Sequence, residues 1–145
     1  MASLWQEREK QLLALRERAK RGGGEARMNK QRAAGKLTAR ERLTLLFDPD
    51  TFVEIGELVE SRIDDFGMDE RRVPGDGVVI GYGRVNGRTV CASSEDFTVI
   101  GGTLGEYHSQ KICRIMDMAI DMKCPFVLIN DSGGARIEEG VASLS

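Results

Sequence analysis

The sequence predicts an α/β domain that follows an N-terminal helical arm. Capping signals and helical spacing of apolar residues dominate positions 1–47, and strand-like alternation begins soon afterwards. In the second half, the sequence predicts three strands, then a helix and then a further strand, an order typical of α/β units. We therefore divide the chain into a basic helical arm, residues 1–47, and the first part of an α/β domain, residues 48–145, with the domain incomplete.

The arm begins with a predicted amphipathic helix over residues 3–21. Ser3 is its candidate N-cap, and the glycines at 22–24 end it. Its apolar residues fall roughly on one face: Leu4, Trp5, Leu12, Leu15 and Ala19. We favour packing against the other arm helices over a direct functional role for this face.

Two shorter helices complete the arm. One is predicted over residues 25–35, and the other over residues 36–47, where Thr38 and Glu41 have the spacing of a capping box. The sequence Asp-Pro-Asp that follows ends the third helix.

Strand patterns follow the arm. Residues 51–59 alternate as in a strand, and residues 62–77 are polar and predict a loop. Two β-rich segments, 77–85 and 88–95, are joined by Asn86-Gly87, which predicts a hairpin with a type I′ turn.

The next segment predicts a strand–helix–strand unit. Residues 96–100 begin extended, and Gly101-Gly102 leads into a helix from about Leu104 to Met122. Its core-facing stripe is predicted to be Leu104, His108, Ile112, Ile115, Ala119 and Met122. The apolar segment 126–130 predicts a central strand covered on both faces, and a further helix is expected after Ala135.

Charge and composition exclude several classes of protein. The net charge is −2, but residues 1–46 carry 12 Lys/Arg against 5 Asp/Glu, a balance of +7. Interleaved acids and leucines argue against a free nucleic-acid tail. The apolar segments are too short to span a bilayer, and no secretory signal or transit peptide is visible at the N-terminus. We expect a cytoplasmic location in a bacterium, or the mitochondrial matrix in a eukaryote.

The cysteines and the histidine do not form a metal motif. Cys91, Cys113 and Cys124 are spaced by 22 and 11 residues, which matches no zinc pattern, and His108 is the one histidine. Reduced thiols and no metal are therefore expected.

Two glycine pairs share one setting, with an extended segment before and a helix after. They are Gly101-Gly102 and Gly133-Gly134. Glycine lets the backbone approach a ligand closely, and a helix start favours an anion. Neither pair completes a P-loop or a dinucleotide fingerprint, so a tight turn remains the alternative.

Longer sequence patterns carry a resemblance to a known family. The segments "AAGKLTARERLTLLFDPDTFVEI", "PGDGVVIGYGRVNGRTV", "SSEDFTVIGGTLGEYHSQKI" and "PFVLINDSGGARIEEGV" together cover nearly everything after about residue 30. They resemble the carboxyltransferase (beta) subunits of biotin-dependent acyl-CoA carboxylases, a family that includes propionyl-CoA carboxylase beta chains and methylmalonyl-CoA decarboxylase alpha subunits. The resemblance implies a crotonase-like (ClpP/crotonase) fold of repeated β-β-α units.

The resemblance also implies an activity and its partners. CO2 would move between carboxybiotin and the α-carbon of an acyl-CoA, with propionyl-CoA or methylmalonyl-CoA as the expected substrate. Biotin would be held by a separate carrier protein or domain that a biotin carboxylase subunit serves. A homo-oligomer of the hexameric ring type is expected, and this chain alone is expected to be inactive, since the biotin side of the family's site is absent from it.

Carried over residue by residue, the resemblance gives a candidate site. The backbone amides of Gly133, Gly134 and Ala135 are the expected oxyanion donors beside the thioester, which develops enolate charge during the reaction. The first glycine turn, Gly101-Gly102, is expected to approach coenzyme A, and the other expected contacts are Arg136, Lys36 and Arg40.

Two positions depart from the family's usual pattern. Glu95 and Glu138 stand where glutamine is common, and Arg136 is the expected partner of Glu138. For Arg136 itself, pairing with Glu138 or Glu139 is favoured over contact with a coenzyme A phosphate. Arg40→Ala is expected to raise the KM for acyl-CoA without changing kcat.

Two other functions stay open at this point. One is an acyl-CoA-binding or assembly module without catalysis, and the other is a hydrolase or isomerase of the crotonase superfamily. Ser132 has no histidine nearby in sequence, which argues against a hydrolase, and Asp131 is expected to be a turn residue.

Overall fold

The computed structural model describes residues 3–144. The arm consists of α1 (Leu4–Lys20), α2 (Glu25–Ala33) and α3 (Ala39–Leu46). Ser3 and Thr38 cap α1 and α3, and each forms a capping box with the residue three positions on. The three predicted helices of the arm are thus confirmed, within two or three residues at their ends.

A four-stranded sheet forms the centre of the domain, in the order β1-β2-β3-β4. The first three strands are antiparallel neighbours, whereas β4 runs parallel to β3. The strands are β1 (Val53–Ile55), β2 (Val78–Val85), β3 (Arg88–Glu95) and β4 (Phe126–Ile129). The connection from β3 to β4 contains α4 (Glu106–Asp121), as the predicted β-α-β unit requires.

The predicted hairpin joins β2 to β3. Asn86 and Gly87 both have positive φ, 51° and 77°, the conformation of a type I′ turn. Val85 pairs with Arg88 directly after the turn, so the register follows from the two-residue loop.

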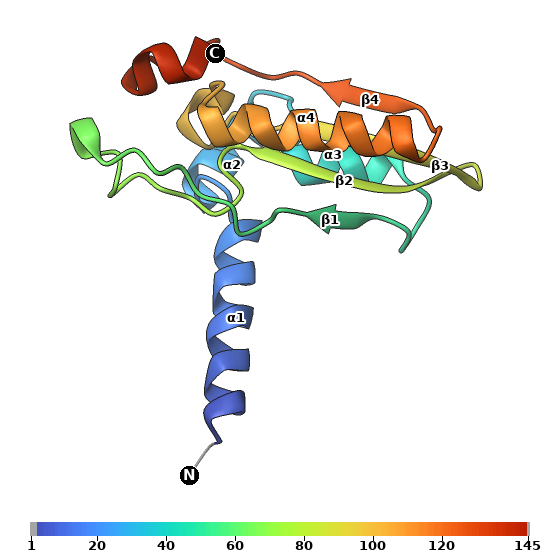
Figure 1. Cartoon of the computed structure of the whole chain (residues 1–145), viewed down its shortest axis with the longest axis horizontal. Coiled ribbons are helices and arrows are strands. Elements are labelled where there is room, and N and C mark those ends of the chain that lie inside the picture. The colour runs from blue at the N-terminus through green and yellow to red at the C-terminus, as the bar shows by residue number, and fades with distance from the viewer. Residues whose placement is uncertain (1–2, 145) are drawn as a thin grey trace.

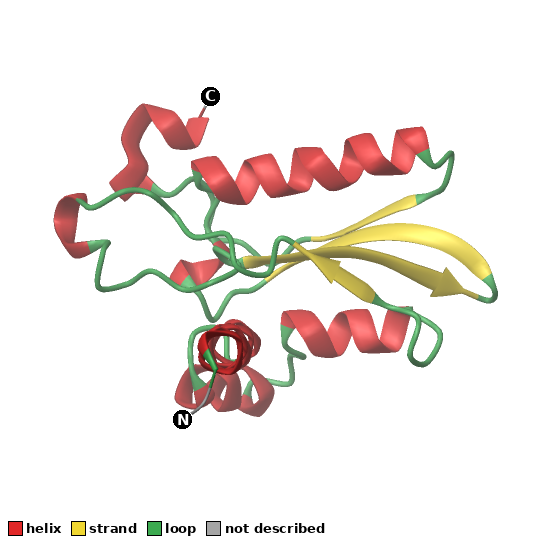
Figure 2. Ribbon diagram, turned by 60° about the horizontal axis from the view of Figure 1, so that its bottom comes forward, coloured by secondary structure: helices red, strands yellow, loops and turns green. Residues whose placement is uncertain are grey.

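Helices cover both faces of the sheet, with α4 on one side and α3 on the other (Figure 2). Alternate residues of β2 and β3 therefore enter two cores. The core beneath α3 contains Ala39, Leu43, Phe47, Val79, Val90 and Ala92. The core beneath α4 contains Val78, Ile80, Cys91, Ile115 and Ala119.

Helix α1 extends away from the rest of the domain (Figure 1). Ala19 is its one residue described as buried, and Trp5 is 77% exposed. The prediction that its apolar face packs against the arm is therefore wrong for most of its length. Within residues 3–144, no helix is both long and apolar enough to cross a membrane.

Three local predictions around the glycine turns are also corrected. Residues after Glu95 are not extended but form a turn that ends in a 3₁₀ segment, Ile100–Gly102. Helix α4 begins at Glu106, because Leu104 forms a parallel bridge with Ala135. The segment Ile137–Leu144 is 3₁₀ rather than α, and Gly140 interrupts it with a φ of 55°.

Strand β4 differs from its prediction in one respect. Phe126 packs against the α4 core while Val127 and Ile129 pack against the α3 core, so both faces are covered. Among the described residues, however, β4 is an edge strand rather than a central one.

Candidate functional site

The two glycine turns lie against each other, beyond the C-terminal ends of β3 and β4. The Gly133 N–H donates to the Gly101 carbonyl at 2.9 Å. The Leu104 N–H donates to the Gly134 carbonyl, and the Arg136 N–H donates to the Leu104 carbonyl, both at 2.8 Å. Two segments that are far apart in sequence, residues 101–104 and 133–136, are thereby joined into one backbone site.

The hydroxyl of Ser132 links the turns a second time. It donates to the Gly102 carbonyl at 2.6 Å and accepts from the Gly134 N–H at 3.2 Å. Of the three predicted donors, Gly133 and Gly134 are therefore already engaged. The third predicted donor, the Ala135 N–H, makes no hydrogen bond within residues 3–144.

Gly102 is required by the contact between the turns. Its φ is 61°, and a Cβ added there would lie 2.3 Å from the Asp131 carbonyl oxygen. That separation is far below van der Waals contact, and the left-handed conformation is itself unfavourable for other residues.

Arg136 holds the turns from beneath and is fully buried. Its guanidinium pairs with Asp76 and with Glu139, each at 2.7 Å, and also donates to the Thr103 carbonyl at 3.1 Å. The structure therefore supports the ion-pair interpretation of Arg136 and leaves no exposed surface on this side chain. Burial raises the pKa of the Asp76 carboxyl, and Arg136 offsets that rise only in part.

Asp131 connects the second glycine turn to the helical arm. Its carboxylate accepts from Arg42 at 2.5 Å and from Lys36 at 3.1 Å. Burial favours the neutral form, but these two hydrogen bonds outweigh it and hold the Asp131 pKa below its ordinary value. The pairing of Arg42 with Asp131 was not predicted, because nothing in the local sequence links Arg42 to a residue 89 positions away.

Arg40 and Glu138 each pair with a residue that the sequence did not indicate. Arg40 makes a two-point contact with Glu54 on β1, at 2.7 and 3.2 Å, which favours a structural role for it. Glu138 pairs with Arg71 at 3.3 Å rather than with Arg136, so the predicted partner of Glu138 is wrong.

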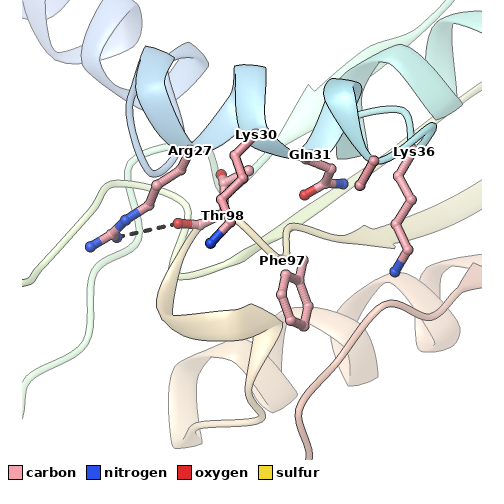
Figure 3. Close-up of a pocket in the computed structure, with 7 residues that line it drawn as sticks. Arg27, Lys30, Gln31, Lys36, Phe97 and Thr98 are labelled. Atoms are coloured by element: carbon pink, nitrogen blue, oxygen red, sulfur yellow. Dashed lines mark hydrogen bonds between the residues drawn. The ribbon is translucent and has the colours of Figure 1, made fainter.

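Two adjoining cavities open beside the turns. The first, here called the turn cavity, has a volume of about 440 Å³. It is lined by Arg27, Arg71, Phe97, Thr98, Ile100, Gly101, Thr103, Gly133, Ala135, Ile137 and Glu138. The second, the arm cavity, has a volume of about 340 Å³ and is lined by Arg27, Lys30, Gln31, Ala34, Lys36, Phe97 and Thr98 (Figure 3). Arg27, Phe97 and Thr98 line both, so the two cavities are neighbours.

The arm cavity combines an aromatic wall with cations from the arm. The Lys36 Nζ lies 5.5 Å from the centroid of the Phe97 ring. The Arg27 guanidinium donates to the Thr98 carbonyl at 3.4 Å, and Lys30 lines the same cavity (Figure 3). An aromatic surface beside basic side chains is suited to a ligand with a flat ring and phosphate groups. Phe97 is 46% exposed in the described structure, and it was not singled out from the sequence.

Other chemistries lack support among the described residues. Residues 3–144 contain no cluster of metal-ligating side chains. Burial raises the pKa of the Cys91 thiol to about 11, with Cys124 Sγ at 3.6 Å, so Cys91 is poorly suited to act as a nucleophile. Ser132 donates to a carbonyl, whereas His108 is buried against the Asp76 carbonyl, so the described chain forms no Ser–His pair.

Comparison with known proteins identifies the family. Residues 30–145 match the family model described as the carboxyl transferase domain. The chain belongs to the carboxyl transferase domain family. This confirms the resemblance carried by the glycine turns and by the segments around them.

Named relatives of this carboxyl transferase chain are longer than it is. It is 56% identical over 127 residues to the propionyl-CoA carboxylase beta chain of Cereibacter sphaeroides, and these cover 88% of this chain and 25% of that protein. It is 57% identical over 124 residues to the methylmalonyl-CoA decarboxylase subunit alpha of Propionigenium modestum, covering 86% and 24% respectively. The chain thus spans about a quarter of the length of these curated relatives.

Solved structures confirm the crotonase-like α/β fold class. A transcarboxylase 12S structure, a hexamer assembly with methylmalonyl-coenzyme A and methylmalonic acid bound, superimposes with a TM-score of 0.94. It is 49% identical, and the match covers 99% of this chain and 28% of that one. A Pseudomonas malonate decarboxylase in complex with malonate superimposes with a TM-score of 0.68 at 25% identity, over 74% of this chain and 42% of that one.

Proposed function

We propose that these residues form the acyl-CoA side of a biotin-dependent carboxyltransferase, which moves CO2 between carboxybiotin and the α-carbon of propionyl-CoA or methylmalonyl-CoA. The observation that carries the proposal is the position of the cationic arm cavity beside the turn cavity, which Ala135 lines and with which it shares Arg27, Phe97 and Thr98. Relatives named for propionyl-CoA and methylmalonyl-CoA support the substrate class.

In this proposal the arm cavity receives the nucleotide end of coenzyme A. Phe97 provides a surface for the adenine ring, and the phosphates of coenzyme A face the basic side chains of Arg27, Lys30 and Lys36. The pantetheine arm then follows the shared wall into the turn cavity, where it delivers the thioester to the second glycine turn.

The Ala135 N–H would donate to the thioester oxygen as enolate charge develops at the α-carbon. Gly133 and Gly134 keep that amide exposed, since their own N–H groups are already bonded within the turns. Carboxybiotin, brought by a separate carrier protein or domain, would supply the CO2, and the biotin released by this step would accept the α-proton. No side-chain base is therefore needed on this chain.

The same proposal includes two partners, a biotin carrier and a biotin carboxylase subunit, and assembly of the chain into a hexameric ring. It also includes the expected compartment, which is the cytoplasm of a bacterium or the mitochondrial matrix of a eukaryote. A homo-oligomer is supported by the transcarboxylase 12S structure, which is a hexamer assembly.

Calorimetric titration of the chain with propionyl-CoA and with propionyl-dephospho-CoA tests the proposal. Propionyl-CoA is expected to bind, and loss of the 3′-phosphate should weaken binding by about tenfold, since a charge-assisted contact contributes roughly 1–3 kcal/mol. Phe97→Ala and Lys30→Gln should each weaken the binding of propionyl-CoA relative to the wild type.

Lys20→Gln is the matched control, since Lys20 lies on α1 and pairs with Glu17. Equal affinity of the wild type and of Phe97→Ala and Lys30→Gln would contradict the assignment of the nucleotide end to the arm cavity.

A further inference from the structure

The thiols of Cys91 and Cys124 are in contact near the start of β4, away from the glycine turns that follow the strand ends. Their sulfur atoms lie 3.6 Å apart, although the two residues are 33 positions apart in sequence. Cys91 is a fully buried residue of β3, and Cys124 is partly buried against the same core beneath α4. The site described above uses neither thiol.

Backbone hydrogen bonds fix the positions of both cysteines. The Cys91 N–H donates to the Pro125 carbonyl at 2.9 Å, and Cys91 pairs with Phe126, the first residue of β4. The Cys124 N–H donates to the carbonyl of Ala119, in the last turn of α4, at 3.0 Å. The contact between the thiols therefore follows from strand pairing and from the end of α4, not from the approach of two mobile side chains.

The separation of the two sulfur atoms favours a disulfide over a metal site. A disulfide bond is about 2.05 Å long, so the sulfurs need to approach by about 1.5 Å, which small rotations of the two side chains supply. A structural zinc ion takes about four ligands. Residues 3–144 contain no group of three or more metal-ligating side chains, so two thiols alone do not make such a site.

We propose that Cys91 and Cys124 are a reversible modification site that hydrogen peroxide converts into a disulfide. The peroxide oxidises the partly exposed Cys124 thiol to a sulfenic acid and releases one molecule of water. The Cys91 sulfur then attacks the Cys124 sulfur, the S–S bond forms, and the sulfenic oxygen leaves as a second molecule of water. The two thiols lose two hydrogen atoms, and a dithiol reductant restores them.

The surroundings of the pair keep it reduced until an oxidant arrives. Burial, together with the hydrogen bond to Cys124, raises the pKa of the Cys91 thiol to about 11. Because the thiolate is the nucleophile in disulfide formation, attack by Cys91 is the slow step. Cys113, on α4, is exposed and competes for the oxidant.

The disulfide tethers β4 to β3. Within the described part of the chain, β4 lies at the edge of the sheet and pairs with β3 alone, and the second glycine turn follows its end. The closed loop contains the first glycine turn and the whole of α4. Closure of a loop of this length lowers the entropy of the unfolded chain, so the oxidised chain is the more stable form.

Peptide mapping after treatment with hydrogen peroxide tests whether the bond forms. Trypsin places the three cysteines in separate peptides, residues 89–111, 112–114 and 124–136. The Cys113→Ser variant is used, because it prevents links between chains through that exposed thiol. Peptides 89–111 and 124–136 are expected to be linked in the monomer and to separate in dithiothreitol. A pair that does not react, or oxidation that stops at Cys124 as a sulfinic or sulfonic acid, would overturn the proposal.

Thermal unfolding and hydrogen exchange test the tether. The oxidised Cys113→Ser chain should unfold about 10 °C above its reduced form, and the backbone amides of β4 should exchange more slowly. The matched control is the double variant Cys113→Ser, Cys124→Ala, which undergoes every other effect of peroxide, including methionine oxidation, and should gain no stability. A disulfide that leaves the unfolding temperature unchanged or lowers it would contradict the role of the bond as a tether.

Discussion

The first and second glycine turns have the same two-glycine sequence but opposite surroundings. In the first turn, Gly102 is buried, and an added Cβ would lie 2.3 Å from the Asp131 carbonyl oxygen. In the second turn, Gly134 has a φ of 105°, and nothing lies within 4 Å of an added Cβ. Packing requires glycine in the first turn, whereas the second turn has open space in front of its backbone.

The two glycine turns therefore have different roles. The first turn supports the second by close backbone contact, and the second is followed by Ala135, which lines the turn cavity. Substitutions in the first turn should therefore affect stability, and substitutions in the second should affect binding.

Replacement of Arg136 should have the largest effect on stability, because Arg136 supports both glycine turns. Arg136→Met leaves Asp76 and Glu139 buried without their partner. The free energy of unfolding should fall by about 3–5 kcal/mol, as measured by urea denaturation. The matched control is Arg71→Met, which removes an exposed pair with Glu138 and should cost less than about 1 kcal/mol. Equal losses in the two variants would show that Arg136 is not the common support.

Gly102→Ala tests the packed turn on its own. A clash with the Asp131 carbonyl and the positive φ together should cost about 3 kcal/mol in thermal or urea unfolding. A stability within about 0.5 kcal/mol of the wild type would mean that the contact between the turns relaxes freely.

A pH titration tests the buried contact of Lys111, on α4, with the carbonyls of Gly75 and Val78. Burial lowers the pKa of Lys111 from 10.5 to about 8. Between these two values the unfolded chain binds a proton that the folded chain does not, so stability should rise with pH across this window. The unfolding free energy of the wild type minus that of Lys111→Met should rise by about 2–3 kcal/mol between pH 8 and pH 10.5. The difference removes the contribution of Cys91, and a flat or falling difference would contradict the prediction.

Gly133→Ala should change stability least and binding most. An added Cβ would lie 3.4 Å from Thr103 Cγ2 and 3.6 Å from the Gly101 oxygen, which are ordinary contacts. Stability should stay within about 0.5 kcal/mol of the wild type. Because Gly133 lines the turn cavity, the methyl group should weaken propionyl-CoA binding by about tenfold, as measured by calorimetry. Unchanged affinity would remove the second turn from the binding site.

Local signals in the sequence predicted most of the secondary structure. The N-cap at Ser3, the capping box at Thr38 and the Asn86-Gly87 turn depend on neighbours within a few residues, so they are visible in the sequence. The bridge between Leu104 and Ala135 is not local. It delays the start of α4, and the helical periodicity of the sequence does not predict this.

The candidate site was predictable only in part. Glycine pairs and the family resemblance indicated the backbone turns, but the partners of their side chains lie far away in sequence. Arg136 pairs with Asp76, 60 residues before it, and Asp131 pairs with Arg42, 89 residues before it. Which amide of the second turn remains free depends on the Ser132 hydroxyl, whose orientation follows from the packing of both turns.

The position of β4 has a consequence for the behaviour of the chain in solution. Its outer side carries a row of backbone donors and acceptors at the edge of the described sheet, and Leu128 is 45% exposed there. Such an edge is a template on which another β-strand can add, whether from a correct partner or from a neighbouring copy. Colloidal stability of the chain therefore depends on whether this edge is covered, independently of how well the glycine turns are held.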